Sequence, residues 1–305
     1  MFDLAPWIQA ARPLAQINIV VPLLFGQALA FATLGHFGFG LLYVAAWFGL
    51  LVQLVIVFTN DLSDRETDAA NLTHARMSGG SRVLPEGKLS PASLRTGAQV
   101  AVAGLAVLSL GLAVAGWFFM PVFAVAAVLL VWAYDHPPLR LAYRGHGELV
   151  QGIGTGVVLP LVGYYLQAGT LAGFYFWALI PLLLLGYTGN ILSALPDVPS
   201  DRGSGKRTYP VRRGQWLARR HSLELLAMAV AMSSWAVPGL PFWGPVAIAV
   251  PVLGVAALAV PLLGSADAEN RPECERFVMT VAGACHFLVV LWSLALVLGR
   301  LLASQ

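Results

Sequence analysis

Long apolar runs divide this chain, and each run has about the length of a membrane crossing. A helix needs about 20 mostly apolar residues to cross a hydrocarbon core of about 30 Å. The pattern predicts an all-α, polytopic membrane protein with about nine transmembrane helices in a single domain over residues 1–305. The expected spans are Pro13–Leu34, Phe39–Thr59, Ala92–Ala115, Phe118–Ala133, Leu149–Gln167, Phe174–Leu195, Leu217–Val237, Phe242–Leu263 and Phe277–Leu301.

Composition supports this class. Of the 305 residues, 58% are hydrophobic and only 11% are charged, whereas a soluble domain carries roughly a quarter charged residues. A water-soluble surface cannot be built from this set. We therefore expect membrane lipid as the surrounding partner and no nucleic-acid partner.

Positive charge lies almost entirely on one side of the predicted bundle. Seventeen of the 18 Lys and Arg residues fall in the N-terminal lead-in and in the loops after the even-numbered spans, and only Arg300 falls on the other side. Positively charged loops stay in the cytoplasm. The pattern thus predicts a cytoplasmic N-terminus, cytoplasmic loops at about 60–90 and 196–216, and a C-terminus outside.

Two of these loops carry clusters of aspartate. On a helix continuing past the second span, Asp61, Asp64 and Asp68 would share one face. Asp197 and Asp201 would do the same after the sixth span, although Pro199 should loosen that turn. Carboxylates at this density favour Mg²⁺, a hard cation that takes one or two carboxylates and completes its shell with water and phosphate oxygens.

A basic, glycine-rich stretch follows each cluster, at Ser78–Arg82 and at Arg202–Thr208. Glycine lets backbone N–H groups turn towards an anion, and Arg and Lys neutralise its charge. These stretches favour binding of a diphosphate. The clusters lie at equivalent places, which indicates two pseudo-repeated four-helix halves followed by a ninth helix.

These motifs resemble the paired signatures of the UbiA superfamily of intramembrane aromatic prenyltransferases. The first is NDxxDxxxD from Asn60 to Asp68, and the second is DxxxDxxxGKRT from Asp197 to Thr208. The resemblance covers nearly the whole chain and includes Arg12-Pro13 at the first span, Val83–Gly87 and Leu89–Pro91 before the third, and Pro137–Leu141 after the fourth. It implies a UbiA-type helical bundle and Mg²⁺-dependent transfer of a polyprenyl group from an isoprenyl diphosphate to an aromatic acceptor.

The resemblance also assigns roles to residues. It implies that Mg²⁺ ions would be held by Asn60, Asp61, Asp64, Asp68, Asp197 and Asp201, with the five aspartates as the catalytic set. The diphosphate would be contacted by Arg82, Arg140, Lys206 and Arg207. Arg12 is a candidate for gripping an acidic acceptor. His136, beside Asp135, is a candidate proton acceptor near the reacting ring.

The acceptor has several candidates. The stretches Gly205–Arg212 and Pro138–Glu148 are most similar to the menaquinone-pathway branch, whose members prenylate dihydroxynaphthoate with loss of its carboxylate. Hydroxybenzoate, homogentisate, chlorophyllide and a glycerol-phosphate lipid precursor remain alternatives. The oligomeric state stays open.

Three other classes fit less well. A secondary transporter should carry ionisable residues near the bilayer midplane. A CDP-alcohol phosphotransferase needs an Asp-Gly opening, whereas Leu62 follows Asp61. A non-catalytic scaffold would have no reason to keep the repulsion among the aspartates. Finally, Gly152-x-Gly154-x-Gly156 lies inside a predicted span, so we expect close helix contact there and no nucleotide loop.

Overall fold

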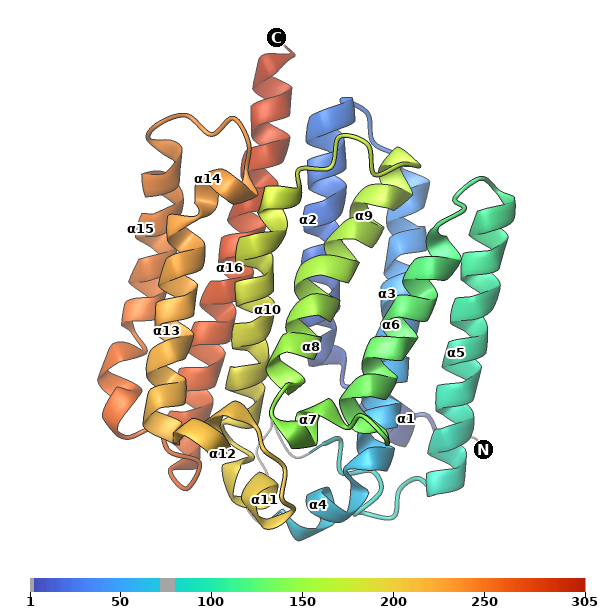
Figure 1. Ribbon diagram of the computed structural model, residues 1–305, viewed down its shortest axis with the longest axis vertical. Coiled ribbons are helices and arrows are strands. Elements are labelled where there is room, and N and C mark those ends of the chain that lie inside the picture. Colours follow the sequence, from blue (N-terminus) through green and yellow to red (C-terminus); the bar gives the residue numbers. More distant parts are fainter. Residues whose placement is uncertain (1–2, 72–79, 305) are drawn as a thin grey trace.

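The computed structural model describes residues 3–71 and 80–304, and within these residues every regular element is a helix. The long helices stand side by side as a bundle, and short helices cluster at one end of it (Figure 1). This confirms the all-α class. Arg76, Ser78 and Gly79, which the charge pattern and the first glycine-rich stretch include, lie outside the described residues.

The long helices match the predicted spans closely. They are α2 (Ile17–Leu34), α3 (Phe39–Ser63), α5 (Pro91–Val114), α6 (Met120–Asp135), α8 (Gly147–Ile153) continuing through the π-helical η2 (Gly154–Val158) into α9 (Leu159–Ala168), α10 (Leu179–Ala194), α13 (Gln215–Ala231), α15 (Gly244–Ala257) and α16 (Arg271–Ala303). The short elements are α1 (Ala5–Ala11), η1 (Pro13–Gln16), α4 (Arg65–Ala70), α7 (Leu141–Arg144), η3 (Phe176–Ala178), α11 (Val198–Gly203), α12 (Tyr209–Arg213), α14 (Ser233–Ala236) and η4 (Val260–Gly264).

Six helical segments of the described chain are long and apolar enough to cross a membrane: 5–34, 39–63, 91–114, 147–168, 176–194 and 271–303. The helices α6 and α15 are apolar but shorter, with 16 and 14 residues. The charged residues of α13, including Arg219, Arg220 and Glu224, all lie within its first ten residues. The chain is thus an integral membrane protein, and the count of nine crossings stays a prediction.

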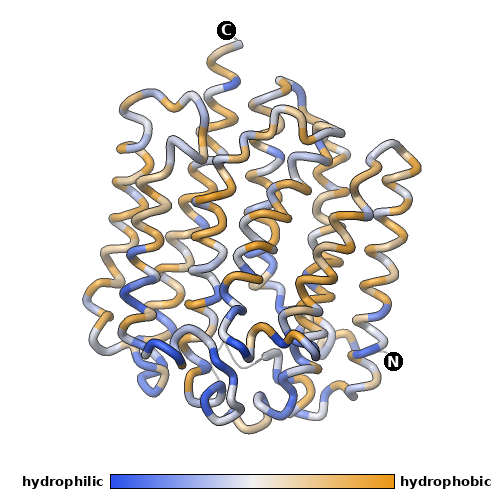
Figure 2. The backbone as a smooth tube through the Cα atoms, viewed as in Figure 1, coloured by the Kyte–Doolittle hydropathy of each residue, from blue (hydrophilic) through white to orange (hydrophobic). Residues whose placement is uncertain are grey.

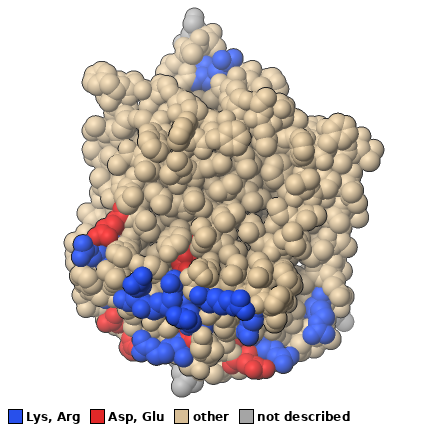
Figure 3. Space-filling view, in the orientation of Figure 1, with Lys and Arg blue, Asp and Glu red and all other residues tan. Residues whose placement is uncertain are grey.

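Charge and hydropathy divide the molecule along its long axis. Hydrophobic residues fill the body of the bundle, and hydrophilic residues gather where α4, α7, α11 and α12 lie (Figure 2). On the face in Figure 3, Lys, Arg, Asp and Glu side chains concentrate at this same end, which we call the polar end. The C-terminus lies at the opposite end, whereas α1 lies near the polar end (Figure 1).

Two glycines let α2 and α9 touch through their backbones. A Cβ on Gly26 would collide with the carbonyl oxygen of Pro160, and a Cβ on Gly163 would collide with that of Leu23. Likewise, a Cβ on Gly156 would meet the backbone of Leu182 in α10. The glycines therefore serve close helix contact, as expected for the series that includes Gly156.

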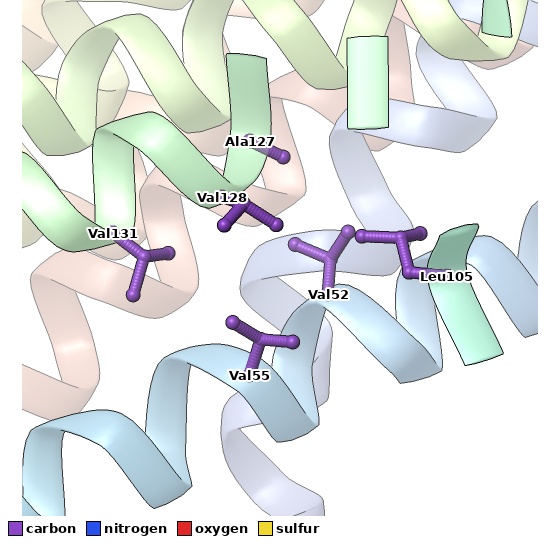
Figure 4. Close-up of a pocket in the computed structure, with 6 residues that line it drawn as sticks. All are labelled: Val52, Val55, Leu105, Ala127, Val128 and Val131. Atoms are coloured by element: carbon purple, nitrogen blue, oxygen red, sulfur yellow. The ribbon is translucent and has the colours of Figure 1, made fainter. Parts of the chain in front are cut away.

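Aliphatic packing aligns α3 with α6. Between α3, α5 and α6 lies a small gap that leaves no room for water (Figure 4). It is lined by Val52, Val55, Leu105, Ala127, Val128 and Val131. At the ends of the two helices, the Ser63 hydroxyl donates to the carbonyl oxygen of Asp135 over 3.2 Å. This packing brings the polar ends of α3 and α6 together.

The α2–α9 contact gives a stability prediction. Gly163→Val should lower the free energy of unfolding by about 1–3 kcal/mol or more, because the added side chain meets backbone that cannot rotate away. The measurement is thermal unfolding of the purified protein in detergent. Gly111→Val is the matched control, since a Cβ at Gly111 meets no atom within 4 Å. Equal losses in the two variants would contradict this account of the contact.

Candidate active site

The first aspartate cluster lies at a break between two helices. The structure differs here from the single continuous helix expected, because α3 ends at Ser63 and Asp64 has φ −94° and ψ 9°. The backbone N–H of Asp64 still donates to Asn60 (2.8 Å), and that of Asp68 donates to Asp64 (2.7 Å). The break thus preserves the spacing, and Asp61, Asp64 and Asp68 are all buried.

The second cluster lies on the short helix α11. The expected loosening by Pro199 is wrong, because Pro199 lies in the first turn of α11, where no N–H is needed for the helix. The N–H of Asp201 donates to the carbonyl oxygen of Asp197 over 2.8 Å. The buried Asp201 carboxylate accepts a hydrogen bond of 2.9 Å from the Thr208 hydroxyl.

The two clusters meet although Asp61 and Asp197 are 136 positions apart. Helix α4 packs against α11. The amide of Asn71 donates to Asp197 over 3.2 Å, and the ammonium of Lys206 donates to Asp64 over 2.8 Å. The structure thus brings both carboxylate clusters and Lys206 into one site at the polar end.

The Asp64 carboxylate accepts hydrogen bonds from three side chains. Besides Lys206, it accepts from the Tyr143 hydroxyl (2.9 Å) and the Asn60 amide (3.0 Å). Burial favours its neutral form, but the Lys206 charge and the three hydrogen bonds outweigh burial and lower its pKa. The guanidinium of Arg140 stacks on the Tyr143 ring, 3.8 Å from its centroid. Asp64 therefore stays charged at neutral pH.

Asp61 is held by the first glycine-rich stretch and by the N-terminal segment. It accepts from the backbone N–H of Ser81 over 3.1 Å, from the Ser81 hydroxyl and from the guanidinium of Arg12. Gly80 has φ 71°, and a Cβ there would collide with the Asp68 carboxylate. Only glycine fits this conformation and this close approach.

The remaining basic candidates differ in position. The guanidinium of Arg82 donates to the carbonyl oxygen of Asp68. Lys206 is buried, whereas its neighbour Arg207 is exposed and offers its carbonyl oxygen to the Nε of Arg212 at 3.0 Å. The structure thus brings Arg12, Arg82 and Lys206 against the aspartates, places Arg140 on Tyr143, and leaves the Arg207 side chain at the surface.

Electrostatics at the site favour a bound cation. Burial, followed by the charge of Asp64, raises the pKa of Asp68 to about 7. Burial also raises the pKa of Asp201 to about 7, although Lys206 opposes it. Burial lowers the pKa of Lys206, but the charges of Asp64 and its other neighbours and the hydrogen bond to Asp64 together outweigh burial and raise it. A divalent cation among these carboxylates would relieve their repulsion.

The donor set fits Mg²⁺ in particular. Among the described residues, no three His, Cys, Asp or Glu side chains converge to form a complete protein cage for a metal. Mg²⁺ needs no such cage, because it takes one or two carboxylates and fills its shell with water and substrate phosphate. The residues available to hold it are Asn60, Asp61, Asp64, Asp68, Asp197 and Asp201.

Four residues at the site were not assigned a role from the sequence. Ser81 binds Asp61, Tyr143 binds Asp64, Asn71 binds Asp197 and Thr208 binds Asp201. Thr208 ends the second motif and Ser81 precedes Arg82, so motif position could have indicated both. Tyr143 and Asn71 carry no comparable signal, since only tertiary packing brings them to the carboxylates.

The model of the UbiA prenyltransferase family matches residues 19–294. The chain belongs to this family. A solved UbiA homologue from Archaeoglobus fulgidus, bound to DMAPP and Mg²⁺, has the same fold, with a TM-score of 0.64 at 14% identity over 96% of this chain and 99% of that one.

Two relatives of known sequence have acceptors in their names. A 2-carboxy-1,4-naphthoquinone phytyltransferase from Synechocystis is 26% identical over 68% of this UbiA-family chain, and the match spans 66% of the relative, just under two thirds of its length. A 1,4-dihydroxy-2-naphthoate octaprenyltransferase from Bacillus subtilis is 28% identical over 77% of this chain and 73% of the relative.

The buried ion pair gives a second stability prediction. Lys206→Met should destabilise the protein by about 3 kcal/mol, because it leaves the Asp64 carboxylate buried without its cation. Asp64→Asn combined with Lys206→Met should recover part of the loss. Thermal unfolding in detergent measures both variants.

The control is Arg220→Met. Arg220 forms an exposed i, i+4 pair with Glu224, which contributes roughly 0.5 kcal/mol or less. If Lys206→Met cost no more than Arg220→Met, the buried pair would not hold the two clusters together.

Proposed function

We propose that this chain catalyses Mg²⁺-dependent transfer of a polyprenyl group from an isoprenyl diphosphate to 1,4-dihydroxy-2-naphthoate. The observation that carries the proposal is the meeting of two aspartate clusters and Lys206 at one end of a UbiA-family bundle. We also infer that residues 1–305 act as one catalytic domain, because the clusters come from segments far apart in the chain.

The site suits binding of a diphosphate. The aspartates and Asn60 would hold Mg²⁺, which, when bound, neutralises charge on the diphosphate oxygens. Lys206, Arg82 and Arg140 lie at or beside these carboxylates and would contribute positive charge to the same group. Arg207 is exposed, so we infer that it approaches the diphosphate from the surface of the site.

The proposed reaction starts with loss of diphosphate. The allylic C–O bond breaks, the electron pair leaves with the diphosphate, and fixed positive charges stabilise that leaving group. Lys206 is suited to this role because its high pKa keeps it charged and its burial strengthens its field. The acceptor ring then forms the C–C bond to the allylic cation, and the ring carboxylate leaves as CO₂.

The choice of acceptor is supported by two relatives. Both carry a naphthalene-based acceptor in their names and match two thirds or more of this chain. The Arg12 guanidinium donates to Asp61 through one terminal nitrogen, and its Nε has no partner among the described residues. Arg12 would therefore use its remaining N–H groups to pair with the acceptor carboxylate. His136 remains a candidate proton acceptor for an alternative acceptor ring that loses a proton instead of CO₂, and its buried Nδ1 has no hydrogen-bond partner among the described residues.

The alternatives predict different positions for the ionisable residues. A transporter would hold them near the middle of the bilayer, whereas here they gather at the polar end (Figure 3). A scaffold would not require the buried carboxylates to be arranged around a lysine. Hydroxybenzoate, homogentisate, chlorophyllide and a glycerol-phosphate lipid precursor remain alternative acceptors for the same chemistry.

Product mass spectrometry tests the function. Membranes containing the protein receive Mg²⁺, a labelled polyprenyl diphosphate and one acceptor at a time. We expect a prenylated naphthoquinol lacking the carboxylate, formed only with dihydroxynaphthoate and abolished by EDTA. Asp197→Ala should lower turnover about 100-fold or more, because it removes a metal ligand.

Asp267→Ala is the control, because Asp267 pairs with Arg219 and belongs to neither aspartate cluster, so the variant should leave turnover unchanged. Product with a different acceptor would reassign the substrate. Normal turnover in Asp197→Ala, or turnover that resists EDTA, would overturn the metal-dependent mechanism.

The positive charges support a cytoplasmic polar end and an external C-terminus. A single cysteine tests this proposal. In a variant with Cys274 and Cys285 replaced by serine, Arg207→Cys should react with a membrane-impermeant maleimide only in inverted vesicles. Ser304→Cys, at the opposite end, should react only in right-side-out vesicles. Both native cysteines are free thiols, so replacing them leaves the introduced cysteine as the single thiol of the variant. The reverse labelling pattern would invert the topology.

A further inference from the structure

Asp135 is a buried carboxylate that belongs to neither aspartate motif. It is the last residue of α6, and only 3% of its surface is exposed. Its Oδ1 atom is fully buried and accepts no hydrogen bond from the part of the chain that the structure describes. A buried carboxylate oxygen without a partner costs free energy, and a bound ligand would offset that cost.

The surroundings of Asp135 are those of the site. The end of α6 lies beside the end of α3, where the Ser63 hydroxyl donates to the Asp135 carbonyl oxygen. Asn60, Asp64 and Lys206 are all close enough to the Asp135 carboxyl group to act on it electrostatically, and the Asn60 amide donates to Asp64 over 3.0 Å. Asp135 is therefore a sixth carboxylate beside Asn60 and Asp64.

Three features oppose a negative charge at this position. The side chain is buried, Asp64 is a like charge nearby, and the C-terminal end of a helix carries partial negative charge. Lys206 gives limited relief, because its ammonium already donates to Asp64 over 2.8 Å. Asparagine or threonine would fill a purely structural role at the end of α6 without this cost.

A ligand at Asp135 must satisfy both its free oxygen and the repulsion from Asp64. A neutral hydroxyl group of an acceptor would satisfy the oxygen but leave two neighbouring carboxylates repelling one another. A divalent cation does both. We propose that Asp135 binds a divalent cation together with Asn60 and Asp64, so that α6 contributes a ligand that neither motif supplies.

This inference rests on the metal site of the proposed function and is independent of the acceptor. It assigns the cation oxygen ligands from α3, the α3–α4 break and α6, with remaining positions left for water and phosphate oxygens. The alignment of α3 with α6 by their aliphatic packing then fixes the distance between these ligands. Movement of α6 would loosen the cation.

Binding of Mn²⁺ tests the proposal without turnover. The full-length protein in detergent is titrated with Mn²⁺ alone, and again with inorganic diphosphate, while electron paramagnetic resonance measures free Mn²⁺. Asp135→Asn should weaken binding of a Mn²⁺ ion about tenfold or more. Asp267→Asn removes a carboxylate at the same end without touching Asn60 or Asp64, and it should bind Mn²⁺ as the wild type does.

Each outcome bears on the inference. Unchanged Mn²⁺ binding in Asp135→Asn would overturn it: a higher acceptor KM would then assign Asp135 to the acceptor, and a lower melting temperature alone would make it structural. If Asp135→Asn does not fold, Asp135→Ser carries the same test. Absence of Mn²⁺ binding by the wild type in both titrations would also overturn it. Wild type that binds Mn²⁺ yet prenylates no acceptor would refute the proposed function and leave this inference standing.

Discussion

The buried ion pair between Lys206 and Asp64 is the interaction on which the polar end of the molecule depends. Lys206 follows α11, and Asp64 joins α3 to α4, so this single contact ties together the segments that carry the two aspartate clusters. It also offsets part of the repulsion among carboxylates that burial has crowded together. Burial, together with the neighbouring carboxylates, still raises the pKa of Asp68 and of Asp201 to about 7, so part of the repulsion remains.

The apolar body of the bundle fixes where this ion pair can form. Helices that cross a hydrocarbon core satisfy their own backbone hydrogen bonds and leave polar side chains for their ends. Close contact of α2 with α9 at Gly26 and Gly163, and aliphatic packing of α3 against α6, hold those ends in register. The loops then need only short helices, α4 and α11, to bring together carboxylates from two distant segments of the chain.

The length of the apolar runs predicted the class of fold and the positions of the long helices, and motif spacing predicted which aspartates would lie close together. The break at Asp64 was not predictable in this way, because a helical pattern continues smoothly from Asn60 to Asp68 across it. The sequence also could not show which of the side chains of Lys206 and Arg207 would be buried in the site. Both are basic neighbours after a glycine, yet packing buries the first and exposes the second. Tyr143 and Asp135 reach the site only through the packing of α6 and α7, which no local pattern records.

Three arginines near the site have an unusual backbone conformation. Arg12, Arg82 and Arg140 have φ values of 46°, 67° and 41°, and in the described chain they are the non-glycine residues with positive φ. This backbone conformation costs about 1 kcal/mol or more for a residue with a Cβ. Glycine would remove the strain and also the guanidinium that contacts Asp61, the Asp68 carbonyl or Tyr143. The strain is therefore the consequence of directing three positive charges at one cluster from three separate turns.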